Sequence, residues 1–243
     1  MSFGLRKVQF GSVACCKVRA SCEKLGDDMQ SILVFGDSLS WGIVPGTRKR
    51  LSFEERWPGV MEHSLLGRGR KVRVIEDCLN GRRTVWEDPF KAGRNGIVGL
   101  GARMEVYSPL ALAIVMLGTN DFQFSTPFNT PWTAGQGVAA IVNEMRRAPI
   151  EPGMVAPPIL IVAPPALRKA EVAAMPKFEG AELRCVGLAE ALRQVAVDLG
   201  CSFFDANAVA RTSAIDGVHL DADQHLLLGA AVAEVVSSID FGA

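Results

Sequence analysis

The feature that most constrains the fold is a regular alternation of short apolar runs with longer amphipathic stretches. Five runs are short, continuous and largely rich in Val and Ile, as strands buried on both faces are. Three of the stretches that separate or follow them carry apolar residues at helical spacing. Strands that alternate with helices predict a parallel sheet wrapped by helices on both faces. The predicted strands are Ile32–Phe35, Val72–Ile75, Ala111–Leu117, Ile159–Val162 and Ser202–Phe204, and the predicted helices are Gly137–Arg147, Ala181–Leu199 and Asp221–Ile239.

The length of 243 residues suits one α/β domain. The first 29 residues show neither a helical nor a strand period, and their stretch Gly11–Ala14 is too short and polar for the apolar part of a secretory signal. We therefore expect a disordered extension over residues 1–29 and a single domain over residues 30–243. The longest apolar candidate, Leu110–Leu117, has the length of a core strand and not of a membrane span.

The charge balance and the cysteines exclude several classes of function. The 26 basic residues equal the 26 acidic ones, which argues against nucleic acid or an anionic membrane surface as the main partner. The six cysteines form no Cys-x-x-Cys pair, and no histidine lies close enough to complete a zinc pattern. We therefore expect no metal and no cofactor. Reduced cysteines fit a cytoplasmic protein.

The residues that carry chemistry follow the predicted strands. Ser38 comes just after the first, Gly81 after the second and Asn120 after the third, and Asp216 and His219 follow the fifth. In parallel sheets, ligands bind outside the carboxyl ends of the strands. The sequence therefore predicts that these residues meet at one edge of the sheet.

Ser38, His219 and Asp216 fit nucleophilic catalysis. A serine hydroxyl is a poor nucleophile until a base takes its proton, and that base needs a third group to orient it. Asp216 stands three residues before His219, so one turn can place its carboxylate on the imidazole. We interpret Ser38 as the nucleophile, His219 as the base and Asp216 as the orienting acid. The alternative is that Ser38 only caps a helix that follows the strand.

Three short motifs resemble the SGNH, or GDSL, hydrolase family. Matching blocks run from about Leu33 to about Leu220 in the family's order, which makes the resemblance specific. It implies a flavodoxin-like three-layer α/β/α sandwich with a central five-stranded parallel sheet. It also implies the same triad of Ser38, Asp216 and His219. The motifs are Gly36–Leu39, Gly118–Asp121 and Asp216–His219.

The same resemblance implies an oxyanion hole. Its donors would be the backbone N–H groups of Ser38 and Gly81 and the side-chain amide of Asn120. Such donors, aimed at the charge that develops on the ester carbonyl, are usually the largest catalytic contribution. Cys78 departs from the family, because many members have glycine there, although Gly81 is retained.

Further motifs are similar to the bacterial aryl esterase and acyltransferase branch, which includes carbohydrate acetyl esterases that form homo-oligomers. This branch implies a serine esterase for small, acetyl-type esters of aryl or alkyl alcohols, with acyl transfer to an alcohol as a variant of the second step. One alternative keeps the triad and removes acetyl groups from a sugar. A remote one is a non-catalytic flavodoxin-like binding module, in which Asp37 would repel a phosphate and the Asp216–His219 pair would be unexplained. The motifs are Leu39–Gly42, Arg56–Val60, Glu76–Leu79, Glu87–Pro89 and Met116–Asp121.

Two long loops rich in aromatic residues and proline, Phe122–Gly135 and Pro164–Gly180, leave the same sheet edge. They either line the pocket, meet a neighbouring subunit or form a local apolar cap. We expect Trp41, Phe122 and Phe178 to contact the small ester substrate. Because exposed aromatic patches usually mark interfaces, we also expect a homo-oligomer.

Overall fold

A sheet of five parallel strands forms the centre of the molecule in the computed structural model, which describes Met1 and residues 29–240. The strands lie in the order β2-β1-β3-β4-β5, and every neighbouring pair is parallel. The predicted five-stranded parallel sheet is therefore confirmed. The strands are β1 (Gln30–Gly36), β2 (Val72–Cys78), β3 (Leu112–Met116), β4 (Ile159–Ala163) and β5 (Ser202–Asp205).

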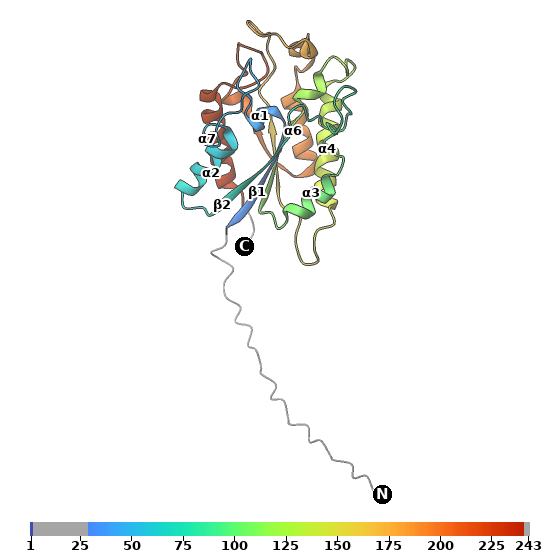
Figure 1. Cartoon of the computed structure of the whole chain (residues 1–243), viewed down its shortest axis with the longest axis vertical. Coiled ribbons are helices and arrows are strands. Elements are labelled where there is room, and N and C mark those ends of the chain that lie inside the picture. Colours follow the sequence, from blue (N-terminus) through green and yellow to red (C-terminus); the bar gives the residue numbers. More distant parts are fainter. Residues whose placement is uncertain (2–28, 241–243) are drawn as a thin grey trace.

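Helices cover both faces of this sheet (Figure 1). Strand β1 shows why, because Ile32 and Val34 pack into the apolar cluster of α2 and α7, whereas Leu33 and Phe35 pack into that of α3, α4 and α6. Alternate residues of a strand face opposite sides, so an all-apolar strand needs a helical layer on each side. The three-layer α/β/α sandwich is confirmed. The helices are α1 (Ser38–Trp41), α2 (Trp57–Gly67), α3 (Leu100–Tyr107), α4 (Pro131–Arg147), α5 (Ala181–Arg184), α6 (Leu188–Leu199) and α7 (Ala222–Ser238), with the 3₁₀ turns η1 (Thr119–Phe122), η2 (Pro176–Phe178) and η3 (Ala206–Ala208).

Two helix predictions need correction. The predicted helix Ala181–Leu199 is two helices, because Gly187 between them has a left-handed φ of 96°. Helix α4 begins at Pro131 and not at Gly137, since Thr130 and Thr133 form a capping box and the proline fits the first helical position. This earlier start shortens the loop after β3.

The described residues leave two expectations open. The predicted extension over residues 1–29 lies outside them, except for Met1 and Met29, and the single domain over residues 30–243 stays a prediction. No helix among the described residues is both long and apolar enough to cross a bilayer.

Candidate active site

The structure brings together three side chains that the sequence holds far apart. Ser38 is the first residue of α1 and is separated from β1 by Asp37 alone, and His219 lies in the loop between β5 and α7. The Nε2 atom of His219 lies 3.1 Å from Ser38 Oγ, and its Nδ1 atom lies 2.7 Å from Asp216 Oδ2. All three side chains are buried. They form the hydrogen-bonded relay that the spacing predicts.

The loop of Asp216 and His219 is shaped mostly by its own backbone, although Asp216 Oδ2 also accepts the N–H of Gly46 at 3.1 Å. Asp216 Oδ1 accepts the backbone N–H groups of Val218, at 3.0 Å, and His219, at 2.9 Å. Gly217 between them has a φ of 74°, and a Cβ there would lie 2.1 Å from the carbonyl oxygen of Arg168. Only glycine fits this position, which fixes the turn that sets His219 against Asp216.

Asp216 fixes the tautomer of His219. Burial raises the pKa of the Asp216 carboxyl, but the hydrogen bond and charge of His219, with the two backbone N–H groups, outweigh it, so the pKa lies well below its usual value. The resulting carboxylate can only accept hydrogen bonds, so His219 carries its proton on Nδ1. Nε2 is then free to accept the proton of Ser38.

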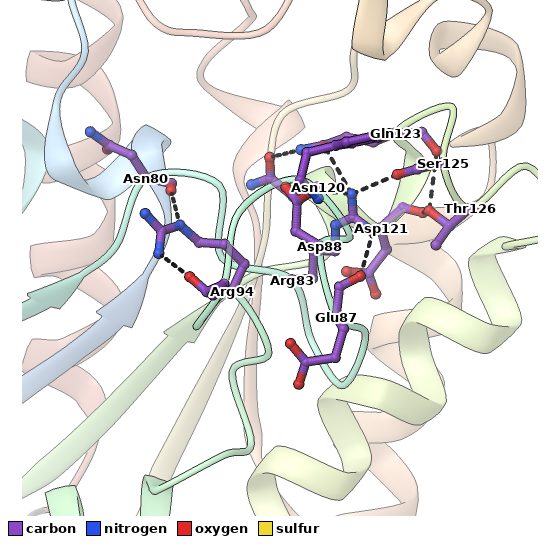
Figure 2. A network of polar contacts seen from close by, with 12 residues as sticks. Asn80, Arg83, Glu87, Asp88, Arg94, Asn120, Asp121, Gln123, Ser125 and Thr126 are labelled. Atoms are coloured by element: carbon purple, nitrogen blue, oxygen red, sulfur yellow. Dashed lines mark hydrogen bonds and ion pairs between the residues drawn. The ribbon is translucent and has the colours of Figure 1, made fainter.

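The expected oxyanion donors lie at the ends of β1, β2 and β3. Within the described residues, the backbone N–H groups of Ser38 and Gly81 have no protein acceptor. Gly81 has a φ of 84°, and the side chain of Arg94 lies beside it and donates to the Asn80 carbonyl at 3.0 Å (Figure 2). Asn120, in η1, donates one N–H of its amide to Asp37 Oδ2 at 2.8 Å, which leaves the other N–H for a substrate oxygen.

Two buried aspartates support these elements. Asp37 Oδ1 accepts the Leu39 N–H at 2.9 Å and caps α1, and burial raises the pKa of Asp37 to about 6. Asp121 accepts both the backbone N–H and the hydroxyl of Thr84, and burial raises its pKa to about 7. The loop after β2 is thereby fastened to the loop after β3.

Two adjacent arginines lie in the loop after β2. Adjacent arginines in a loop are commonly solvated, or they contact substrate, but Arg82 and Arg83 are both buried. Arg82 donates to Asp77 and to the Gly36 carbonyl, and Arg83 donates to Gln123. Neither role has a local signal in the sequence, because each depends on partners from other elements.

The three expected substrate contacts differ in outcome. Trp41 is half-buried at the end of α1, with the Arg50 guanidinium 4.7 Å from its ring. Phe178 is 7 % exposed and lines a cavity of about 350 Å³ that includes Asp216 and Val218 but neither Ser38 nor His219. The prediction for Phe122 is wrong: its ring is 0 % exposed within the core, because η1 turns it inward.

This site defines a class. Serine hydrolases combine a serine activated by a histidine–aspartate pair with amide donors for the oxyanion. This site has both, at the carboxyl ends of the strands of a parallel sheet.

The class narrows to a family. Residues 34–231 match the model of the GDSL-like lipase/acylhydrolase family, and the chain belongs to this family. It is a carboxylic ester hydrolase of the SGNH type.

Several solved structures resemble the chain closely. The aryl esterase of Mycobacterium smegmatis, in an inhibitor-bound form, is 33 % identical with a TM-score of 0.80, over 87 % of this chain and 100 % of that one. Est24, a carbohydrate acetylesterase from Sinorhizobium meliloti, is 33 % identical with a TM-score of 0.79, over 86 % and 99 %. A putative arylesterase from Agrobacterium tumefaciens is 36 % identical with a TM-score of 0.78, over 87 % and 100 %. No curated protein matches the chain.

Proposed function

We propose that this esterase hydrolyses short, acetyl-type esters of aryl or alkyl alcohols through a covalent acyl-Ser38 intermediate. The observation that carries the proposal is the relay from Asp216 through His219 to Ser38, with its distances of 2.7 and 3.1 Å. The similarity to aryl esterases at 33–36 % identity supports this class of alcohol.

The mechanism follows from the positions of these atoms. Ser38 Oγ attacks the ester carbonyl while His219 Nε2 takes its proton. The N–H groups of Ser38, Gly81 and Asn120 hold the oxyanion that forms. As the C–O bond to the alcohol breaks, His219 returns the proton to the leaving oxygen. Water, or a second alcohol in acyl transfer, then attacks the acyl-enzyme with His219 again as the base, and Ser38 is released.

The second part of the proposal is a homo-oligomer whose neighbouring subunits narrow the entrance to each site. Three large aromatic side chains in the segment that follows Asn120 are exposed: Phe124 (55 %), Phe128 (66 %) and Trp132 (68 %). We call these three residues the aromatic patch. Water-exposed aromatic surface of this kind favours contact with another protein surface, and a second copy always offers the same patch.

Hydrolysis rates across p-nitrophenyl esters from acetate to decanoate test the substrate class. We expect kcat/KM to be highest for acetate and to fall with acyl length, because a narrow entrance excludes long chains. Adding benzyl alcohol measures acyl transfer as the yield of benzyl acetate. Preference for the long esters would refute the proposed substrate class.

Light scattering tests the assembly. We expect a multiple of the 26.1 kDa chain mass, and Phe128→Ser with Trp132→Ser should lower it. Val106→Ser is the matched control, because Val106 is exposed on α3, which ends before β3 begins and so lies at the opposite sheet edge. A wild-type monomer that still prefers acetate would place the restriction within one chain, on Trp41 and the loop after β3.

A second candidate substrate is an acetylated sugar. The similarity to a carbohydrate acetylesterase at 33 % identity favours it. Acetate release from peracetylated xylose, compared with that from phenyl acetate at equal concentration, decides between the two alcohols.

We also propose a cytoplasmic location. Among the described residues, Cys78, Cys185 and Cys201 are free thiols, which suits a reducing compartment. Fractionation of cells that express the untagged chain tests this location.

A further inference from the structure

A continuous chain of polar side chains lies behind the oxyanion hole. Arg83 Nη2 donates to Gln123 Oε1 at 2.9 Å, and Gln123 Nε2 donates to Asn120 Oδ1 at 2.7 Å (Figure 2). Asn120 Nδ2 then donates to Asp37 Oδ2 at 2.8 Å. All four side chains are buried.

The two ends of this chain fix the orientation of both amides between them. A guanidinium can only donate hydrogen bonds, and a carboxylate can only accept them. Gln123 must therefore turn its oxygen to Arg83 and its NH₂ to Asn120. Asn120 must in turn present its oxygen to Gln123 and its NH₂ to Asp37. Reversing either amide would bring two donors or two acceptors together, at a cost that is high in a buried site.

Arg83 and Gln123 are themselves held firmly. Arg83 also donates to the Glu87 carbonyl at 2.9 Å and to Ser125 Oγ at 2.8 Å (Figure 2). The carbonyl of Gln123 accepts from both the backbone N–H and the hydroxyl of Thr126. The donor that reaches Asn120 therefore comes from a residue fixed at both its backbone and its side chain.

We propose that Gln123, backed by Arg83, is a positioning residue for the oxyanion hole. It holds the Asn120 amide so that its second N–H is ready before the reaction begins. Preorganised donors stabilise the transition state because they need no reorganisation as charge develops. The hydrogen bond into Asn120 Oδ1 also polarises the amide and strengthens its N–H donors. This inference rests on the proposed role of Asn120 in ester hydrolysis.

Two variants of nearly the same shape test it with p-nitrophenyl acetate. Gln123→Met removes the donor, and we expect kcat to fall about tenfold, a part of the 10²–10³-fold that a whole oxyanion donor is worth. Gln123→Glu replaces the donor by an acceptor that repels Asn120 Oδ1, and its loss should exceed that of Gln123→Met. KM should stay within about twofold in both variants, because the effect belongs to the transition state. The matched control is Gln194→Met, the same substitution at an exposed glutamine of α6 whose amide donates only to Asp198, and it should leave kcat within about twofold of the wild type.

A double-mutant cycle separates positioning from general loss of structure. In an Asn120→Ala background, Gln123→Met should lower kcat by less than about twofold, because the group through which it acts is gone. A full additional loss in that background, an unchanged kcat in the single variants, or a loss in KM alone would overturn the inference. A wild-type protein that hydrolyses no p-nitrophenyl ester would instead refute the proposed function.

Discussion

The two halves of the active site are held in place differently. Asp216 receives two of its three backbone donors from residues two and three positions further along, and only the third, the Gly46 N–H at 3.1 Å, comes from a distant segment. The loop of Asp216 and His219, here called the acid–base loop, is therefore fixed largely by its own residues. Asn120 depends on Asp37, which lies 83 positions away, and on Gln123, which depends on Arg83 40 positions away. A turn closed mostly by its own residues is less sensitive to changes elsewhere than a network that crosses several loops.

The buried carboxyl groups of the two halves also differ in the direction of their pKa shifts. The pKa of Asp216 is lowered despite burial, so its stabilising effect is present above its unfolded value of 3.8 and is lost as the pH falls through the folded value. Burial raises the pKa values of Asp37, to about 6, and Asp121, to about 7, so ionising them costs stability. The fold stabilises the ionised form of Asp216. It destabilises the ionised forms of Asp37 and Asp121, whose hydrogen bonds hold the oxyanion half in place.

The largest effect should come from the nucleophile. Ser38→Ala removes the nucleophile that both halves of the site serve, so no acyl-enzyme can form. We expect kcat to fall by at least about 10⁴-fold with the fold intact. Phenylmethanesulfonyl fluoride should label the wild-type protein once per chain, at Ser38. Labelling of another serine, located by peptide mass spectrometry, would reverse the assignment.

Asn120 measures the oxyanion half alone. Asn120→Ala should lower kcat by about 10²–10³-fold with little change in KM, because its donor acts mainly in the transition state. Asn120→Asp should be at least as harmful, since its carboxylate would repel both the oxyanion and Asp37. If steady-state kinetics showed a change in KM alone, Asn120 would bind substrate and would not be an oxyanion donor.

Asp121 tests the cost of buried charge. Between about pH 4 and pH 7 the native carboxyl keeps a proton that the unfolded chain has lost, so wild-type stability falls as the pH rises. Asp121→Asn removes this titration. Relative to the variant, the wild type should lose about 2–4 kcal/mol of unfolding free energy between these two pH values. Urea denaturation at each pH gives the difference, and a value independent of pH would show that Asp121 does not titrate there.

Thr84 should give the smallest effect. Thr84→Val keeps the shape and the backbone donor to Asp121 but removes the hydroxyl, so we expect a loss of about 1–2 kcal/mol in unfolding free energy. Thr84→Ser retains the hydroxyl and serves as the control. Equal losses in both variants would point to packing against Gly137 and not to the hydrogen bond.

The same contrast explains what the sequence could predict. The spacing of apolar residues predicts the strands, the helical layers and the position of Ser38 after the first strand. The spacing of three residues predicts the contact between Asp216 and His219. Gln123 and Arg83 could not be found in this way, because each gains its role from a partner that only the folded sheet brings near. The break at Gly187 and the burial of Phe122 were missed for a related reason. A helical pattern does not reveal a left-handed residue within it, and a loop pattern does not reveal which ring turns inward.

The strand order has a consequence for how such an enzyme can change. The chain leaves β1 for β2 on one side and then returns past it to β3 on the other, so the loops that follow β1 and β3 part at the sheet edge. The point beside Ser38 at which these loops diverge is therefore set by the strand order and not by the length of any loop. Loops such as residues 164–180 can lengthen, shorten or exchange residues around this point while the reacting atoms keep their positions. The loops therefore set the range of substrates, whereas the sheet sets the positions of the reacting atoms.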